Sequence, residues 1–202
     1  MANAAHRRAT RDDFARAIAE GRAVELIAGE LIERAAPTFD HGQAQSKVNG
    51  QLDAFNRSGG GPRGPGGWWL ATEVEVLYPK FEEVFRHDVV GFRRDRQPAR
   101  PSSFPVEERP DWACEVLSTS TRRGAARRAG RVYDLVKKQR TLHAHGVPHY
   151  WLLDPDAEVL TVLRWSEPGY VQILTATVGE RVRAEPFDAI ELSVSELFGH
   201  DE

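Results

Sequence analysis

The sequence predicts a mixed α/β fold of the α+β kind, in which helices flank a β-sheet. The chain has 202 residues, which suits a single domain over 1–202 with a substantial core. Apolar residues recur at helical spacing in some segments and follow strand-like patterns in others. Two apolar runs, at 112–118 and 149–154, enclose a helical pattern, so we expect two parallel strands joined by a crossover helix.

The first third of the chain predicts a helix, a hairpin and a second helix. Thr10 followed by Asp13 resembles a capping box, and the helix that it starts should end near residue 20. Residues 24–35 hold two β-rich runs on either side of an Ala-Gly pair, which predicts a hairpin. A helical pattern covers 41–55. Residues 58–67 contain six glycines and two prolines, so they predict a flexible loop.

The remainder predicts a strand-rich region interrupted by one long helix. A proline-rich loop at 93–110 precedes the third of its strands. An arginine-rich insert at 119–131 leads into a helix at 132–145, which Gly146 and Pro148 end. Strands are expected at 68–78, 84–92, 112–118, 149–154, 159–165, 169–175 and within 181–192, and a short last helix at 193–198.

Composition excludes several classes of protein. Hydrophobic residues make up 41% of the chain and charged residues 28%, which are ordinary globular values. No apolar run approaches the ~20 residues that span a bilayer, and the first residues lack the apolar core of a signal peptide. We therefore expect a cytoplasmic protein with no membrane partner. The single cysteine, Cys114, excludes an intramolecular disulfide and a cysteine-based zinc site.

The formal net charge of −3 conceals an uneven distribution of charge along the chain. Residues 86–140 hold 14 Lys and Arg against 7 Asp and Glu, a formal charge of +7. Residues 151–202 hold 3 against 11, a charge of −8. A uniformly basic nucleic-acid-binding protein is excluded, but a local basic face is not. We expect residues 86–140 to form one basic face, with an acidic face away from it.

Isolated charged residues interrupt the apolar strands. Asp88 precedes a Val-Val pair, Glu115 lies inside the run that starts at 112, and Lys138 follows on the next helix. A buried carboxylate needs a partner, a metal or solvent. Asp88 and Glu115 could hold Mg²⁺ through oxygen ligands, helped by the Val116 main-chain carbonyl. A lysine beside them could assist water or a phosphate, which fits metal-assisted phosphodiester hydrolysis. Spacing alone favours the alternative of structural ion pairs.

Motifs for other chemistries are missing from the sequence. It contains no G-x-x-x-x-G-K phosphate-binding loop and no dinucleotide fingerprint, so we expect no nucleotide cofactor. The serines and threonines of 118–121 are not set in a G-x-S-x-G nucleophile elbow.

Three strings are informative in combination, namely RPDWACEVLSTST (109–121), YDLVKK (133–138) and HGVPHYWLLDP (145–155). Together they resemble the Uma-two family of restriction-endonuclease-like proteins, which have a PD-(D/E)XK nuclease fold. The similarity extends over most of the chain, including 24–42. It implies a restriction-endonuclease-like mixed sheet with flanking helices. It also implies DNA as the substrate, Mg²⁺ or Mn²⁺ as the cofactor, and a possible homodimer.

The resemblance also assigns residues to roles. Asp88 stands at the family's first acidic position, where His87 replaces the usual preceding proline. Glu115 stands at the glutamate of the family's E-x-L-S string. The lysine comes from the following helix, where Lys138 lies four residues after Asp134. Asp88, Glu115 and the Val116 main chain would bind the metal, and Lys138 would assist the attack.

Supporting residues are less firmly indicated. His41 resembles the family's amino-terminal histidine, and it either faces the site or only starts a helix. Glu30, in the hairpin, is a weaker candidate for the same neighbourhood. Glu73 and Glu75 are expected to be exposed strand residues.

Arginines on both sides of the carboxylates could follow a phosphate backbone. The alternative is a solvated loop whose arginines pair with the acidic carboxyl-terminal region. The residues concerned include Arg93, Arg94, Arg122 and Arg123.

The sequence thus leads to two principal hypotheses. The first is a metal-dependent DNA endonuclease. The second is an inactive member of the same fold that binds DNA or protein, because the arginine-rich insert is longer than the family pattern and Thr119 replaces its usual proline. A third reading is a dimerisation module that uses the tryptophan-rich strands.

Overall fold

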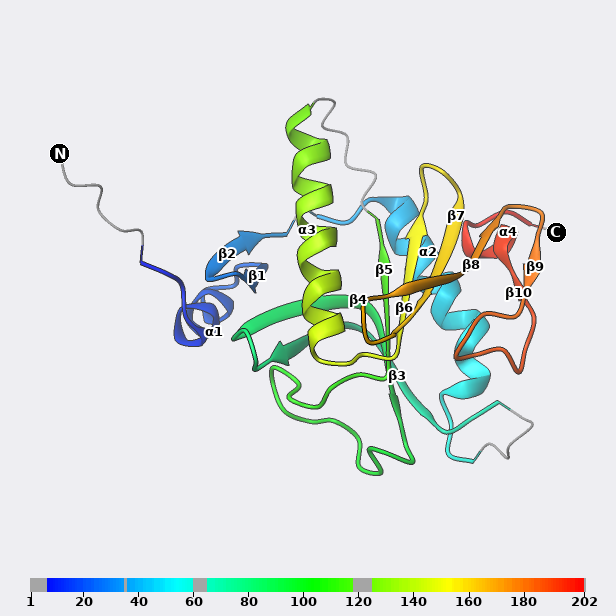
Figure 1. Cartoon of the computed structure of the whole chain (residues 1–202), viewed down its shortest axis with the longest axis horizontal. Coiled ribbons are helices and arrows are strands. Elements are labelled where there is room, and N and C mark those ends of the chain that lie inside the picture. Colours follow the sequence, from blue (N-terminus) through cyan, green and yellow to red (C-terminus); the bar gives the residue numbers. More distant parts are fainter. Residues whose placement is uncertain (1–6, 35, 60–64, 118–124, 202) are drawn as a thin grey trace.

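The computed structural model of the protein describes residues 7–34, 36–59, 65–117 and 125–201. The predicted mixed α+β architecture is confirmed, because helices flank an eight-stranded mixed sheet (Figure 1). The elements are α1 (Arg11–Ala19), β1 (Val24–Ile27), β2 (Glu30–Glu33), α2 (Phe39–Leu52), η1 (Asp53–Phe55), β3 (Trp68–Tyr78), β4 (Glu83–Arg93), β5 (Trp112–Val116), α3 (Ala125–Ala144), β6 (His149–Asp154), β7 (Val159–Arg164), β8 (Val171–Thr177), β9 (Arg181–Val182), β10 (Leu192–Ser193) and α4 (Val194–Leu197).

The strands of the large sheet lie in the order β2-β1-β4-β5-β6-β7-β8, and β3 also pairs with β4. β5 and β6 are parallel, and α3 connects them as predicted. β3 pairs with β4 along its length. The other edge of β4 is shared, because β1 pairs with it at Val84 and β5 pairs with it from Val89 to Gly91. Residues 85–88 therefore lie where β1 and β5 part.

Two helices cover opposite faces of the sheet (Figure 1). Successive strand residues point to opposite faces. Cys114 of β5 packs in a core that contains Val48 of α2, whereas Ala113 packs in a core that contains Leu142 of α3. Glu115 shares the alternation of Ala113, so the fold directs its side chain toward α3.

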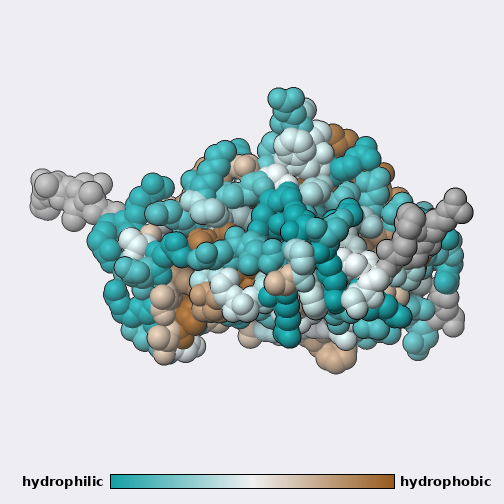
Figure 2. All heavy atoms as spheres, turned by 90° about the horizontal axis from the view of Figure 1, so that it is seen from below, coloured by the Kyte–Doolittle hydropathy of each residue, from teal (hydrophilic) through white to brown (hydrophobic). Residues whose placement is uncertain are grey.

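Most of the tryptophans stabilise the core. Trp112 and Trp151 are fully buried and meet edge to face, with ring centroids 5.1 Å apart. Trp68 is buried as well, while Trp165 is partly exposed. The face drawn in Figure 2 is mostly hydrophilic, with small separate hydrophobic areas. Within the described part of the chain, no helix is both long and apolar enough to cross a membrane.

The long helix begins earlier than predicted. α3 starts at Ala125, whereas the sequence predicted an insert up to 131 and a helix from 132. Alanine and arginine both favour helix, so the part of the predicted insert from 125 to 131 continues the helix. Residues 119–124 of that insert lie outside the described residues.

Candidate functional site

Asp88 lies in the stretch of β4 where β1 and β5 part, and its side chain is only 3% exposed. The main-chain N–H of Val116, at the end of β5, donates to Asp88 Oδ2 at 2.7 Å. This bond places the Asp88 carboxylate beside the peptide that joins Glu115 to Val116. The sequence separates Asp88 from Glu115 by 26 intervening residues, and the pairing of β4 with β5 brings them together.

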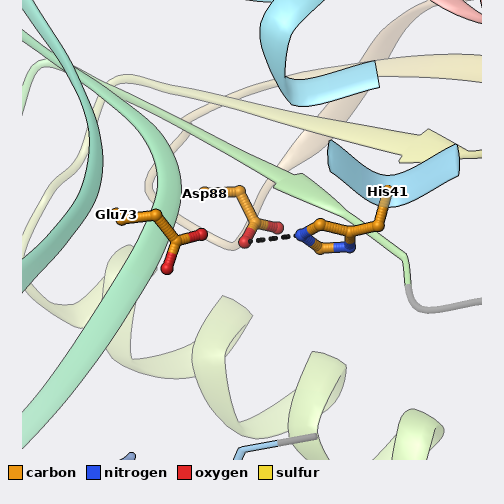
Figure 3. A group of neighbouring side chains, drawn as sticks. All are labelled: His41, Glu73 and Asp88. Carbon is orange, nitrogen blue, oxygen red and sulfur yellow. Dashed lines mark hydrogen bonds and ion pairs between the residues drawn. The ribbon is translucent and has the colours of Figure 1, made fainter. Parts of the chain in front are cut away.

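The second oxygen of Asp88 faces two donors. His41 Nε2 lies 3.2 Å from Asp88 Oδ1 (Figure 3). Arg34 Nη2 lies 3.3 Å from the same atom. Thr38 caps α2 by accepting from the main-chain N–H of His41, which fixes this residue in the first turn of the helix. Burial lowers the pKa of His41, but the hydrogen bond and charge of Asp88 outweigh burial and raise it. His41 therefore faces the site.

Glu73 of β3 lies opposite Asp88 in a distorted part of the sheet. Its φ of 55° is in the left-handed region, which is uncommon for a residue with a side chain. Gln45 of α2 donates to the Asp88 main-chain oxygen at 2.6 Å and to Glu73 Oε1 at 2.9 Å. Ligand atoms of His41, Glu73 and Asp88 lie within 4.8 Å of one another (Figure 3). Arg34 Nη1 lies 3.5 Å from Glu73, so a cation already neutralises part of this group.

Glu115 is held through both carboxylate oxygens. His87 Nδ1 lies 2.6 Å from Glu115 Oε1, and Lys138 Nζ donates to Oε2 at 3.1 Å. Burial raises the pKa of Glu115, but the positive charge of Lys138 and the hydrogen bond with His87 outweigh burial and lower it. The carboxylate form is therefore favoured in spite of burial.

Lys138 reaches the site from α3 and pairs with two carboxylates. Its Nζ lies 2.9 Å from Glu25 Oε1 of β1, in addition to its contact with Glu115. Glu25 also accepts from the main-chain N–H of Arg86 at 2.9 Å. Burial lowers the pKa of Lys138, but Glu115 and Glu25 outweigh burial and raise it above its ordinary value. Lys138 is therefore a permanent cation and not a base that could accept a proton from water.

The charges of the site fit a divalent cation. The ion-paired group contains five carboxylates and three permanent cations, namely Glu25, Glu73, Glu75, Asp88 and Glu115 with Arg34, Arg86 and Lys138. The formal excess is two negative charges before any protonated histidine is counted. Carboxylate and carbonyl oxygens are the ligands that Mg²⁺ and Mn²⁺ prefer. Asp88, Glu115 and the Val116 carbonyl would form such an oxygen-rich set.

Two expectations from the sequence need correction. Glu30 is exposed at the hairpin end of β2, and the glutamate that reaches the site is Glu25 of β1. Glu75 is buried and not exposed, because β3 pairs with β4 so that Arg86 lies opposite it and donates at 2.7 Å. Glu73 is exposed as expected, yet it lies beside Asp88.

The arginines that were expected at the site have other contacts. Arg93 pairs with Asp95 at 2.5 Å. Arg94 donates to the main-chain oxygen of Trp68 at 2.8 Å, and its guanidinium carbon lies 3.4 Å from the ring centroid of Trp69. A role of either arginine in binding DNA remains a prediction.

The positions of three further predicted side chains are outside the described part of the chain. Arg122 and Arg123 lie outside the described residues. Asp134 lies on α3 one turn before Lys138, and its side chain is outside the described part of the chain.

Sequence reasoning missed four residues that contact the predicted ones, namely Glu25, Arg34, Gln45 and His87. Only His87 carried a signal, because it stands where the resembled family has proline. The other three reach the site through contacts between distant segments.

Comparisons with known proteins identify the family and a similar fold. The model of the Uma-two family (Uma2), described as "Putative restriction endonuclease", matches residues 11–195. A crystal structure described as a "putative nuclease" from Anabaena variabilis has a similar fold, with a TM-score of 0.68 and 21% sequence identity. The similarity covers 94% of this chain and 97% of that one. A comparison with curated proteins gives no match.

Proposed function

Since the chain belongs to the Uma-two family of restriction-endonuclease-like proteins, we propose that it is an endonuclease that hydrolyses phosphodiester bonds of DNA with Mg²⁺ or Mn²⁺ as cofactor. One observation supports this most strongly. Asp88 and Glu115 are both buried, the main-chain N–H that follows Glu115 donates to Asp88, and the buried Lys138 pairs with Glu115. A structural ion pair would need neither the second carboxylate nor the excess of negative charge.

Asp88, Glu115 and the Val116 carbonyl would hold the cation. When bound, a divalent cation supplies positive charge that stabilises the phosphate as it is attacked and makes a nearby water more acidic. The surrounding groups keep the two carboxylates in place. His41 and Arg34 hold one oxygen of Asp88, and the Val116 N–H holds the other.

Lys138 would act as a fixed positive charge. An ammonium group has three N–H donors, and the contacts with Glu25 and Glu115 use two of them. The third can donate to a phosphate oxygen or orient the attacking water. Held between Glu25 and Glu115, the ammonium group of Lys138 would stabilise negative charge on the phosphate.

The proposal predicts metal-dependent cleavage that requires Glu115. Supercoiled plasmid incubated with the purified protein should be nicked or linearised with Mg²⁺ or Mn²⁺ and left intact with EDTA. Glu115→Gln should reduce the rate at least about 100-fold, because even residues that only support metal ligands contribute about 10–100-fold.

Glu30→Gln is the matched control, because it removes the same charge from an exposed position in the hairpin, and it should cleave normally. Equal cleavage by wild type and Glu115→Gln would overturn the proposal. Salt-dependent binding of DNA by the wild type without cleavage would instead favour an inactive, DNA-binding member of the family.

A further inference from the structure

His87 is a buried histidine immediately before Asp88, and both of its ring nitrogens have partners. Its side chain is fully buried. Nδ1 lies 2.6 Å from Glu115 Oε1, and Nε2 lies 2.6 Å from the hydroxyl of Tyr78. A buried imidazole is stable only when its polar atoms are satisfied, and these two contacts satisfy both.

The chemistry of Glu115 fixes the direction of the hydrogen bond at Nδ1. A carboxylate can only accept, so Nδ1 of His87 must donate to Glu115. Burial and the charge of Glu115 raise the pKa of Tyr78 well above its ordinary value, so its hydroxyl keeps its proton. That hydroxyl lies within hydrogen-bond distance of Nε2 and holds the opposite side of the ring.

Packing holds Tyr78 in place beside His87. The residue is 1% exposed and pairs with Glu83 where β3 and β4 meet. Its ring lies against those of Phe85 and His145, with centroid distances of 5.1 Å to each. The hydroxyl can therefore serve as a rigid anchor for the imidazole.

We propose that Tyr78 and His87 are positioning residues that orient the Glu115 carboxylate for a divalent cation. His87 fixes Oε1 while Lys138 contacts Oε2, so the plane of the carboxylate is set from both sides. Residues that hydrogen-bond to a metal ligand in this way orient the ligand and tune its affinity. The proline that the resembled family has at this position could make no such bond. This inference rests on the proposed function, because Glu115 is there a metal ligand.

Mn²⁺ binding measured by calorimetry tests the positioning role of Tyr78 and His87 without any cleavage assay. His87→Gln removes the donor at the Nδ1 position and should weaken Mn²⁺ binding about 10–100-fold. The amide of His87→Asn can take the place of Nδ1, so the loss should be smaller. Tyr78→Phe removes one oxygen and frees the ring, and it should weaken binding less than His87→Gln.

Tyr150→Phe is the matched control. Tyr150 is also fully buried, and its hydroxyl has no hydrogen-bond partner among the described residues. This variant should bind Mn²⁺ as the wild type does. Wild-type affinity for Mn²⁺ in both His87 variants, or tighter Mn²⁺ binding by His87→Gln than by His87→Asn, would overturn the positioning role of His87.

Nitrogen-15 NMR of the metal-free protein gives a readout that does not depend on the proposed function. His87 should show a protonated Nδ1, and Tyr78→Phe should change the Nε2 signal. An Nδ1 without a proton would overturn the role of His87 even if the protein is a nuclease. Failure of the wild type to bind Mn²⁺ would overturn both the proposed function and the role assigned here.

Discussion

At the scale of single residues, the ion pair between Lys138 and Glu25 sets the pKa of a buried carboxylate at the site. Glu25 is buried, and burial raises its pKa, but Lys138 and then Arg34 outweigh burial and lower it. A group whose pKa is lower in the folded protein stabilises the fold above its unfolded pKa. That stabilisation disappears as the pH falls through the folded pKa. The site should therefore be sensitive to acid.

Glu25→Gln tests this pH dependence. The variant should be less stable than the wild type at pH 7, by about 1–3 kcal/mol, because Lys138 loses a charged partner. The difference should shrink as the pH falls below the ordinary pKa of 4.5, since the carboxylate takes up a proton first in the unfolded chain and, below its lowered pKa, in the folded protein as well. Urea unfolding from neutral to acidic pH measures the free energy of unfolding. A difference that stays constant across this range would contradict the assignment, and Glu30→Gln should show none.

The contrast between Glu25 and Glu30 shows what a sequence can indicate about a site. Asp88 and Glu115 could be selected because each is a charged residue beside or inside an apolar run, whereas Lys138, which stands next to Lys137, is assigned by the family resemblance. Glu25 and Glu30 lie in similar runs of one hairpin, V-E-L-I and E-L-I-E, so local patterns do not distinguish them. Only the pairing of β1 with β4 brings Glu25 to Lys138.

At the scale of elements, β4 is the strand on which the site depends. It pairs with β3, β1 and β5, and it carries both His87 and Asp88. Gly91 lies where the backbone of β4 comes close to the side chains of two tryptophans. A Cβ atom there would lie 2.9 Å from a side-chain carbon of Leu70, 3.1 Å from Trp68 and 3.2 Å from Trp112. A side chain at this position would push the strand away from its core.

Gly91→Ala should consequently lower the free energy of unfolding by about 1–3 kcal/mol, the usual cost of overpacking a core. Gly50→Ala in α2 is the control, because a Cβ atom there meets open space. It should be neutral or stabilising by about 0.4–1 kcal/mol. Thermal and urea unfolding of both variants measure the difference. A Gly91→Ala protein as stable as the wild type would show that β4 does not pack as described.

The order and type of these elements could be predicted well, but some boundaries could not. The strand at 68–78 has the predicted limits, and the parallel pair at 112 and 149 follows from the crossover helix. The start of α3 differs because arginines were interpreted as a solvated insert, while their helix propensity allows the helix to begin at Ala125. The distortion at Glu73 has no local signal in the sequence, and in the fold this residue accepts a hydrogen bond from Gln45 of α2.

At the scale of the whole molecule, the fold gathers charges that are dispersed in the sequence. The basic excess of 86–140 supplies Arg86 and Lys138, but Arg34 comes from the first part of the chain. Arg93 and Arg94 bind neighbouring groups instead. The pairing of the strands therefore determines which cationic side chains contact the carboxylates. The net charge of a sequence segment does not predict these contacts.

The location of the metal tests the account most directly. Crystals of the protein soaked in Mn²⁺ can be examined by anomalous diffraction, which identifies the ion independently of its ligands. The account predicts a peak bounded by the carboxylates of Asp88 and Glu115 and the carbonyl of Val116. A peak beside His41 and Glu73 that excludes Glu115, or no peak at the carboxylates, would contradict it.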